Sequence, residues 1–327
     1  MSYKNPPFDL TPFMAEKCRQ IAYILGLLEG AKLVPNPIKL RKESQIKTIQ
    51  SSLAIEGNKL TLEQVTELLE GKKVVGPKKD ILEVTNAIEV YKDLQTWNAL
   101  SLKSLKKAHY VLMNGLIPDQ GQWRTKDVGI FKGKEIAHVA PPAKMVPQLM
   151  EDLVAYIKDT KEFPWLIKGC FFHYELEFIH PFSDGNGRIG RLWQQVILMK
   201  ENPTFEYVSV ESMIRNDQSN YYKTLSMCDK KGDSTLFIEY SLNQILAALN
   251  TYFKDFEVRR KMTVNERLQY VKEKFKDKRF QRKEYIQAIR DISTATASRD
   301  LEYGFINNIL LKFGNKKLTE YQFKRLT

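Results

Sequence analysis

Residues 165–191 join a helix that is apolar all round to a glycine-rich loop, and this pairing constrains the fold more than any other feature. Apolar side chains recur on every side of residues 165–179, as in a helix enclosed by other helices. Pro181 disfavours helical geometry at the residue before it, so the helix should end at His180. The sequence therefore predicts a core helix with His180 at its end.

The loop at residues 180–191 reads His-Pro-Phe-Ser-Asp-Gly-Asn-Gly-Arg-Ile-Gly-Arg, which is a composition suited to binding an anion. Gly185 and Gly187 allow phosphate oxygens to approach main-chain N–H groups closely. A second helix should begin here, with Arg188 and Arg191 on one face of its first turns, where the helix dipole already favours negative charge. The loop lacks the lysine and hydroxyl of the Gly-x-x-x-x-Gly-Lys-[Ser/Thr] type, so another family is required.

Position by position, this loop resembles the signature His-Pro-Phe-x-[Asp/Glu]-Gly-Asn-Gly-Arg-x-x-Arg of the Fic family. The resemblance implies transfer of AMP from ATP to a Ser, Thr or Tyr hydroxyl of a target protein. His180 would be the general base, because imidazole titrates near the working pH, and Asp184 would bind Mg2+. The other candidates would bind nucleotide, either at the phosphates or, for the two tyrosines, near the base: Gly185, Asn186, Gly187, Arg188, Arg191, Tyr221 and Tyr222.

A second motif, Ser-Leu-Ala-Ile-Glu-Gly at residues 52–57, ends a helix predicted at about 38–57, with Gly57 as a left-handed stop. It resembles the inhibitory pattern [Ser/Thr]-x-x-x-Glu-[Gly/Asn] of the same family, which makes Ser52 and Glu56 inhibitory candidates. The resemblance implies that Glu56 pairs with Arg191 and keeps the γ-phosphate from seating, since carboxylate and phosphate compete for the same donors. In some relatives the matching glutamate also supports removal of AMP, and the sequence leaves that alternative open.

Two short stretches, residues 128–131 and 136–139, predict a β-hairpin around a turn at 132–135. In the Fic family this element is a flap over the active site, here about residues 122–140. Its free edge could receive an extended target segment as an added strand, at Ile136, Ala137, His138 and Val139. The alternative is a small structural hairpin that covers a helical bundle.

The tail resembles a winged helix-turn-helix, a known C-terminal partner of Fic domains. A helix at residues 283–290 precedes a second helix opened by Ser293 or Thr294, and two alternating stretches follow at 309–313 and 318–323. The resemblance implies that Thr296, Ser298 and Arg299 face a major groove and that Lys316 and Lys317 contact phosphates. Such modules also dock proteins or form homodimers, so DNA is one of several candidate partners.

Composition agrees with this interpretation without producing it. The chain has 327 residues, 43% of them hydrophobic, which is enough for a sizeable core and more than one domain. Its 51 basic and 39 acidic residues give a net charge of +12, which attracts polyanions without naming one. Three cysteines without paired or metal spacing, and no signal peptide or membrane-spanning run, predict a cytoplasmic protein with no membrane partner.

Together these features predict a mainly α fold, a Fic-type helical bundle with a β-hairpin flap plus a C-terminal winged helix-turn-helix. The predicted domains are an N-terminal helical region at 1–100, a catalytic core at 101–258 and the winged helix at 259–327. The predicted function is an autoinhibited protein adenylyltransferase. The alternatives are a DNA-binding regulator whose Fic portion is weakly active or senses nucleotide, and a bifunctional enzyme that also removes AMP.

Overall fold

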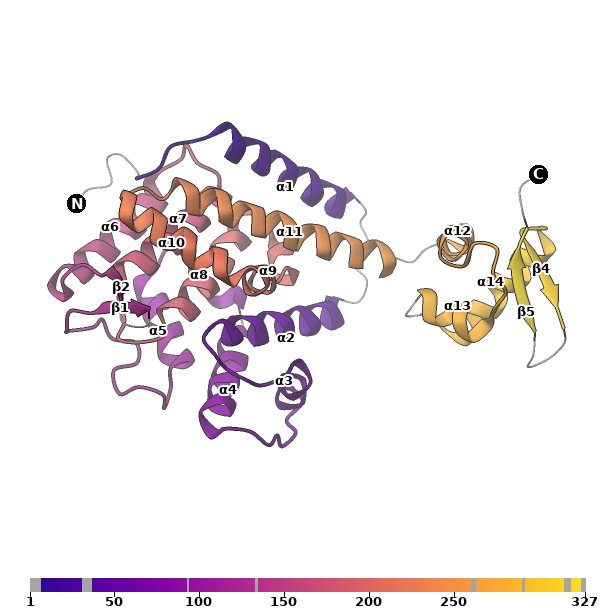
Figure 1. The fold of residues 1–327 in the computed structure, drawn as a ribbon, viewed down its shortest axis with the longest axis horizontal. Coiled ribbons are helices and arrows are strands. Elements are labelled where there is room, and N and C mark those ends of the chain that lie inside the picture. The colour runs from indigo at the N-terminus through magenta and orange to yellow at the C-terminus, as the bar shows by residue number, and fades with distance from the viewer. Residues whose placement is uncertain are drawn as a thin grey trace. The chain divides into compact units, whose positions relative to one another are not determined.

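The computed structural model describes residues 7–30, 37–92, 94–132, 135–259, 263–289, 292–314 and 319–324. These residues are mainly helical, which confirms the predicted fold class (Figure 1). The chain divides into two compact units, residues 1–27 with 37–251 and residues 28–36 with 252–327, and each is described by itself. The division falls within the helix at Thr235–Arg259, slightly before the predicted domain start at residue 259.

The first unit is a helical bundle with one hairpin. Its longer helices are α1 (Pro12–Gly30), α2 (Pro37–Ile55), α3 (Leu62–Leu69), α4 (Lys78–Lys92), α5 (Leu102–Leu112), α6 (Val146–Asp159), α7 (Trp165–Ile179), α8 (Asn186–Glu201), α9 (Val210–Asn216), α10 (Gln218–Lys231) and α11 (Thr235–Arg259). Short 3-10 turns lie at Leu94–Thr96, Ala143–Met145 and Pro203–Tyr207. None of the helices in the described part of the chain has both the length and the apolar character needed to cross a membrane.

Helices α7 and α8 form the centre of this bundle. Residues 166–176 of α7 and 188–198 of α8 are buried throughout, as the all-round apolar pattern of α7 predicts. The two helices pack closely because two glycines face the partner helix. A Cβ on Gly169 would lie 3.3 Å from Leu198, and one on Gly190 would lie 3.0 Å from Glu177. This tight pair fixes both ends of the loop that joins α7 to α8.

The N-terminal helices pack around α8. Helix α2 contacts α3, α4, α8 and α9. It ends at Ile55, and Gly57 then takes the left-handed conformation that its sequence predicts, with φ +90°. The next helix, α3, begins with a capping box, in which Thr61 and Gln64 each bond to the main chain of the other. These turns place Glu56 at the α8 side of α2.

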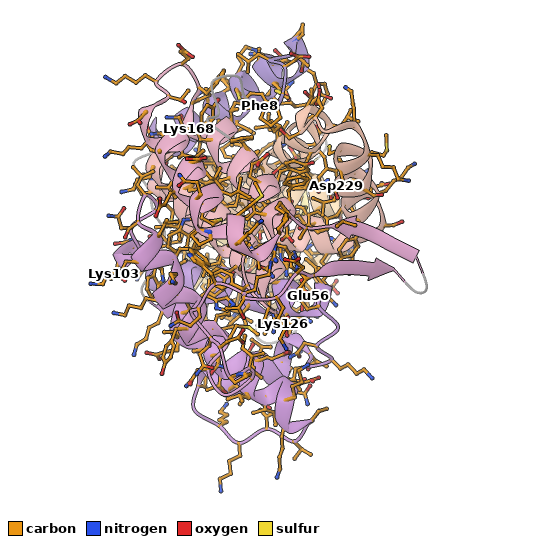
Figure 2. The ribbon with its side chains drawn as sticks, turned by 90° about the vertical axis from the view of Figure 1, so that its left-hand side faces the viewer. Phe8, Glu56, Lys103, Lys126, Lys168 and Asp229 are labelled. Carbon is orange, nitrogen blue, oxygen red and sulfur yellow. The ribbon has the colours of Figure 1, made fainter. Side chains whose placement is uncertain are left out.

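The hairpin consists of β1 (Gly129–Lys132) and β2 (Glu135–Val139), paired antiparallel with an irregular register between Ile130 and Phe131. Figure 2 shows it projecting beyond the helices. Both strands lie within about one residue of their predicted positions. The side chains of Ile136, Ala137 and His138 lie outside the described residues, whereas Val139 is exposed.

The second unit contains α12 (Val264–Phe275), β3 (Phe280–Gln281), α13 (Arg282–Ile289), α14 (Thr294–Ile306), β4 (Leu310–Phe313) and β5 (Glu320–Phe323). The strands form an antiparallel sheet in the order β3-β5-β4. Ser293 begins α14 by accepting a 3.0 Å hydrogen bond from Thr296 N, as a cap should. This order of elements is the one expected of a winged helix-turn-helix, which stays a prediction for this unit.

A separate core holds the second unit together. Apolar side chains from its helices and strands pack in one cluster, which includes Leu268, Phe280 and Leu301. At its edge, the guanidinium of Arg267 donates two 2.5 Å hydrogen bonds to the carboxylate of Asp300, and Tyr285 Oη donates a third at 3.2 Å. The buried Asp300 is therefore fully compensated, which stabilises α12 against α13 and α14.

Candidate active site

His180 stands directly after α7 in a left-handed conformation, with φ 49° and ψ 59°. Its main-chain N–H donates to Leu176 O at 2.9 Å, which completes the last turn of the helix. Its Nδ1 lies 3.3 Å from Glu177 O. Because a positive φ is unusual for histidine, surrounding contacts must hold this residue in place.

Much of that support comes from one buried cation, Arg124, which is 3% exposed. Its Nε donates to His180 O at 2.7 Å, and its main-chain N–H donates to Pro181 O at 2.9 Å. The rest of the guanidinium donates to Lys126 O and Pro141 O, which flank the hairpin on either side. Arg124 therefore connects the base of the hairpin to the residue that ends α7.

The loop itself is shaped by Asn186 and Gly185. Asn186 Oδ1 accepts from Phe182 N and its Nδ2 donates to Phe182 O, both at 2.9 Å. Gly185 has φ +83°, and a Cβ there would lie 2.6 Å from Met113 Sδ, so the position excludes a side chain. The Asn186 side chain, predicted to bind nucleotide, bonds to the loop main chain in this structure.

His109 contacts the loop through its ring face and through a ring nitrogen. Its ring stacks on Phe182 with centroids 3.6 Å apart and planes 6° from parallel. Its Nε2–H donates to Asp184 O and its Nδ1 accepts from Gly121 N, both at 2.9 Å. Burial lowers the pKa of His109 to about 4, which keeps the ring neutral and preserves the Nδ1 acceptor.

Arg191, on the second turn of α8, is held by the end of α2. Its side chain is 1% exposed, and its Nη2 donates to Glu56 Oε1 at 2.7 Å. Ser52 accepts two more hydrogen bonds, at Oγ from Arg191 Nε (3.1 Å) and at its carbonyl from Nη2 (3.0 Å). Burial lowers the pKa of Arg191, but Glu56, together with Tyr221 and Glu177, more than offsets burial, so the pKa is raised. The predicted partners Ser52, Glu56 and Arg191 thus lie together.

Glu56 also lies against the first turn of α8. A Cβ on Gly187 would stand 2.6 Å from Glu56 Oε1 and 3.1 Å from Arg191 Nη1. The first N–H groups of a helix have no acceptor within it, and no side chain caps α8 at Gly185. The carboxylate of Glu56 therefore lies beside the first turn of α8, a region where main-chain N–H groups and the helix dipole favour an anion.

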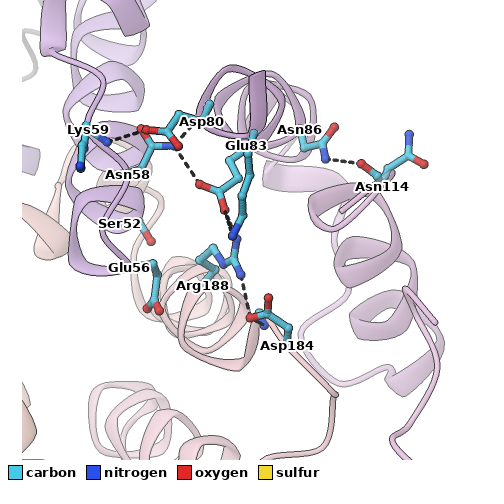
Figure 3. A network of polar contacts seen from close by, with 12 residues as sticks. Ser52, Glu56, Asn58, Lys59, Asp80, Glu83, Asn86, Asn114, Asp184 and Arg188 are labelled. Atoms are coloured by element: carbon cyan, nitrogen blue, oxygen red, sulfur yellow. Dashed lines mark hydrogen bonds and ion pairs between the residues drawn. The ribbon is translucent and has the colours of Figure 1, made fainter. Parts of the chain in front are cut away.

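Arg188, one turn before Arg191, is held by two other carboxylates (Figure 3). Its Nη1 donates to Glu83 Oε1 on α4 at 3.1 Å, and its Nη2 donates to Asp184 Oδ1 at 2.9 Å. The three side chains differ in exposure, since Arg188 and Glu83 are 6% and 8% exposed and Asp184 is 52% exposed. Both loop arginines are thus buried and paired with acids.

Asp184 is the residue predicted to bind Mg2+. Its Oδ1 accepts from Arg188 Nη2 and, at 2.6 Å, from Gly185 N. Over the part of the chain that the structure describes, no group of three or more His, Cys, Asp or Glu side chains could hold a metal ion. A single exposed carboxylate fits Mg2+, which keeps most of its waters and is commonly bound jointly with substrate phosphates.

The two tyrosines predicted near the nucleotide base differ in their surroundings. Tyr221 is 1% exposed, and its hydroxyl bonds to His173 Nε2 at 3.1 Å inside the core. Tyr222 is 41% exposed, and burial together with the nearby Glu56 carboxylate raises the pKa of its hydroxyl. Of the two, Tyr222 is the one whose side chain a ligand at this site could reach.

In the second unit, the polar side chains at the start of α14 form hydrogen bonds with nearby residues of the same unit. Ser298 Oγ donates to Thr294 O at 2.9 Å and accepts from Arg282 Nη1 at 3.0 Å, and Thr296 Oγ1 lies 3.0 Å from Ser293 Oγ. Arg299 is exposed. A groove of about 900 Å³ runs beside them, with Arg282, Ser298, Glu302 and Phe305 among its lining. Lys316 and Lys317 lie outside the described residues.

Three residues of the site carry no role in the sequence interpretation: Glu83, His109 and Arg124. For two of them, Glu83 and His109, the sequence pattern does indicate a buried polar contact. Glu83 shares an apolar helical stripe with Ala87, Val90 and Leu94, and His109 shares one with Leu105 and Leu112. A charged or polar side chain on such a stripe needs a buried partner. Arg124 has no comparable signal, because its acceptors are main-chain carbonyls.

Comparison with known proteins agrees with the loop motif. The model of the family described as "Fic/DOC family" matches residues 99–198. The chain is 27% identical to Protein adenylyltransferase fic-1 of Caenorhabditis briggsae over 226 residues, which cover 65% of this chain and 42% of that protein. It is 28% identical to Protein adenylyltransferase Fic of Nematostella vectensis over 240 residues, or 68% and 53% of the two chains. The chain thus spans about half the length of these curated relatives.

Solved structures extend the similarity to the whole chain. A crystal structure of a Fic family protein from Desulfovibrio desulfuricans G20 superposes with a TM-score of 0.73 and is 35% identical, covering 99% of both chains. Fic-1 of C. elegans (residues 134–508) superposes with a TM-score of 0.60 over 74% of this chain and 73% of that one. At 22% identity, the second match shows a shared fold only.

Proposed function

Because this chain belongs to the Fic family, we propose that it is a protein adenylyltransferase restrained by its own N-terminal helix. The curated relatives named protein adenylyltransferase support this activity for the chain. The observation that carries the proposal is the N-terminus of α8. There the buried Arg188 and Arg191 lie beside N–H groups without a side-chain cap, and the Glu56 carboxylate bonds to Arg191 and lies against Gly187. Such a site suits the polyphosphate of ATP.

In the proposed reaction, a Ser, Thr or Tyr hydroxyl of a target protein attacks the α-phosphorus of ATP. A new bond forms between the hydroxyl oxygen and phosphorus, the bond to the β-phosphate breaks, and pyrophosphate leaves. The hydroxyl proton passes to the imidazole of His180, whose place after α7 is fixed by Arg124. AMP remains attached to the target.

The leaving pyrophosphate carries the charge that the protein must stabilise. The N–H groups of the first turn of α8 and the guanidinium groups of Arg188 and Arg191 are suited to accept it. Asp184 would hold Mg2+, which neutralises phosphate charge when it is bound. The remaining loop residues, Asn186 among them, keep these donors in position.

Autoinhibition follows from the position of Glu56. Its carboxylate bonds to Arg191 and lies against Gly187, so a γ-phosphate would need the same donors and the same space. ATP can be bound productively only after the carboxylate moves away. Movement of the α2 terminus is therefore the proposed regulatory step, and the same carboxylate could orient a water for removal of AMP.

The target would bind at the hairpin. β1 and β2 pair only with each other among the described strands, so an extended segment could add at an edge by main-chain hydrogen bonds. Val139 is 68% exposed and available for such contact. This mode would align a hydroxyl without selecting a strict target sequence.

Labelled nucleotides test the reaction. Incubation of the Glu56→Gly protein with kinase-inactivated lysate and ATP labelled at the α-phosphate should label protein above the lysate background, whereas ATP labelled at the γ-phosphate should give no labelling above that background. Transfer of the γ-label would indicate a kinase and overturn the proposal. The His180→Ala version of the same protein is the control and should transfer neither label.

A second candidate function is DNA binding by the second unit, favoured by its charge. Residues 252–327 contain 19 Lys and Arg against 10 Asp and Glu, so most of the net charge of the chain lies there. Retention of labelled duplex DNA by the full chain, falling steeply as salt rises, would support it. Retention that is absent at low salt would contradict it.

A further inference from the structure

Two carboxylates hold Arg188, and they are unlike in burial and in attachment. We propose that Glu83 is a positioning residue that keeps the Arg188 guanidinium directed at the β- and γ-phosphates of ATP, while Asp184 is the partner that phosphate replaces. This inference rests on the proposed function. It concerns an ion pair, 3.1 Å long, between α4 and α8 that the reaction itself does not require.

The attachment of Glu83 is rigid (Figure 3). Its second oxygen, Oε2, accepts a 2.9 Å hydrogen bond from Asn58 Nδ2, which also donates to Asp80 O at 3.0 Å. Asn58 Oδ1 in turn accepts from Leu60 N at 3.0 Å. Main-chain groups on two segments therefore fix the amide, and the amide fixes Glu83. The other oxygen, Oε1, accepts from Arg188 and has the exposed Lys79 Nζ 3.9 Å away.

The two ion pairs of Arg188 differ in burial, and this difference determines which of them a phosphate can replace. Glu83 and Arg188 are both more than nine-tenths buried, and separating them would leave the buried Glu83 carboxylate with only the Asn58 amide and, at 3.9 Å, the exposed Lys79 Nζ. Asp184 is 52% exposed, so water can solvate it when it leaves Arg188. Binding of Mg2+ at Asp184 would favour the same departure. Nη2 of Arg188 is then released toward phosphate while Nη1 stays with Glu83.

Arg188 also has an unused donor. Its Nε is buried, and no hydrogen-bond acceptor for it lies among the described residues. A buried N–H without a partner destabilises the protein, so an anion that supplies an acceptor is favoured there. This orphan donor is consistent with a guanidinium held ready for a ligand.

Asn58 connects this pair to the inhibitory segment, since it lies two residues after Glu56. Arg191 and Arg188 are thus paired with acids from neighbouring segments, but the pairs have different consequences. Glu56 lies against Gly187 in the anion site, whereas Glu83 contacts Arg188 from α4 and is fixed by Asn58. We therefore assign inhibition to Glu56 and positioning to Glu83.

The test compares ATP with AMP, because only ATP has the β- and γ-phosphates that Arg188 would contact. Dissociation constants for both nucleotides, with Mg2+, are measured by calorimetry on the full chain carrying Glu56→Gly. The same measurements follow after adding Glu83→Ala or the isosteric Glu83→Gln. Glu89→Ala is the matched control, since Glu89 is exposed on the same helix.

We expect Glu83→Ala to weaken ATP about tenfold or more and AMP less than about twofold, with Glu83→Gln between Ala and the parent. The Glu89 control should match the parent for both nucleotides. If the Gln variant lost affinity equally for ATP and AMP, Glu83 would have only a structural role, and the inference would be overturned. Tighter ATP binding would overturn it too, because Glu83 would then be a second inhibitor. A folded parent that binds neither nucleotide would overturn the proposed function itself.

Discussion

Glu56 and Arg191, 135 residues apart in the chain, form a 2.7 Å ion pair at the N-terminal end of α8. The guanidinium is completely enclosed, whereas the carboxylate side chain is 31% exposed. The acid can therefore leave toward solvent, while Arg191 stays in place for a replacement anion. This asymmetry makes the pair suited to reversible restraint of a phosphate site.

Ser52 should contribute to that restraint, but less than Glu56 does. Its Oγ accepts from Arg191 Nε, but its carbonyl, which any residue would retain, also accepts from Nη2. We expect Ser52→Ala to raise target labelling severalfold, less than Glu56→Gly does, because only one hydrogen bond of the guanidinium is lost while the Glu56 ion pair and the bond to the Ser52 carbonyl remain. Initial rates with ATP labelled at the α-phosphate measure this. Activation by Ser52→Ala equal to that by Glu56→Gly would contradict the assignment.

Replacement of His180 should remove transfer and spare binding. In the Glu56→Gly background, His180→Ala should lower the transfer rate at least about a hundredfold, because the attacking hydroxyl loses its general base. The dissociation constant for ATP should change little, since the phosphate donors lie on α8. Rates and calorimetry on one protein preparation separate the two effects. Transfer that persists at the parent rate would exclude His180 as the base.

Arg124 should affect the rate more than nucleotide binding. It holds the His180 carbonyl and both flanks of the hairpin, and none of its described hydrogen bonds joins the α8 arginines. Arg124→Met should lower kcat roughly tenfold or more, because small displacements of a base are costly. Arg124→Lys, which keeps one donor, should lie between Met and the parent. A Met variant with an unchanged kcat and a lower Tm would show a role in stability alone.

His109 should make the catalytic unit sensitive to acid. Its pKa is lowered from 6.5 to about 4 by burial, so the unfolded chain binds more protons than the folded one between these values. Stability from this residue is complete above pH 6.5 and is lost as pH falls toward 4, on the order of 3 kcal/mol. Melting curves between pH 7 and 4 should show a shallower acid slope for His109→Gln. Identical slopes for variant and parent would refute this explanation.

The sequence predicted those parts of the site for which a single segment contains both the required residue types and their spacing. The loop motif, the left-handed Gly57 and the pairing of Glu56 with Arg191 follow from two short motifs, and the structure has these residues together. The all-round apolar pattern likewise predicted that α7 is buried. Local sequence determines the turn at Gly57 and the burial of α7, whereas the pairing of Glu56 with Arg191, 135 residues apart, is what the family resemblance implies.

Other parts depend on contacts that no single segment specifies. Asn186 has the residue type of a phosphate ligand, but closure of the loop leaves both ends of its amide on Phe182. Arg124 donates hydrogen bonds to carbonyl groups of distant segments. Every residue has a main-chain carbonyl, so the pattern of side chains cannot predict these partners. Glu83 meets Arg188 across 105 residues, a pairing that only the packed bundle defines.

Intact mass spectrometry of the Glu56→Gly protein, incubated with ATP and Mg2+, decides whether this protein transfers AMP. We expect an increment equal to one adenylyl group on the protein or on an added target, absent when His180→Ala is included. A folded protein that gains no mass on itself or on any target in lysate would contradict it, as would an increment equal to a single phosphate.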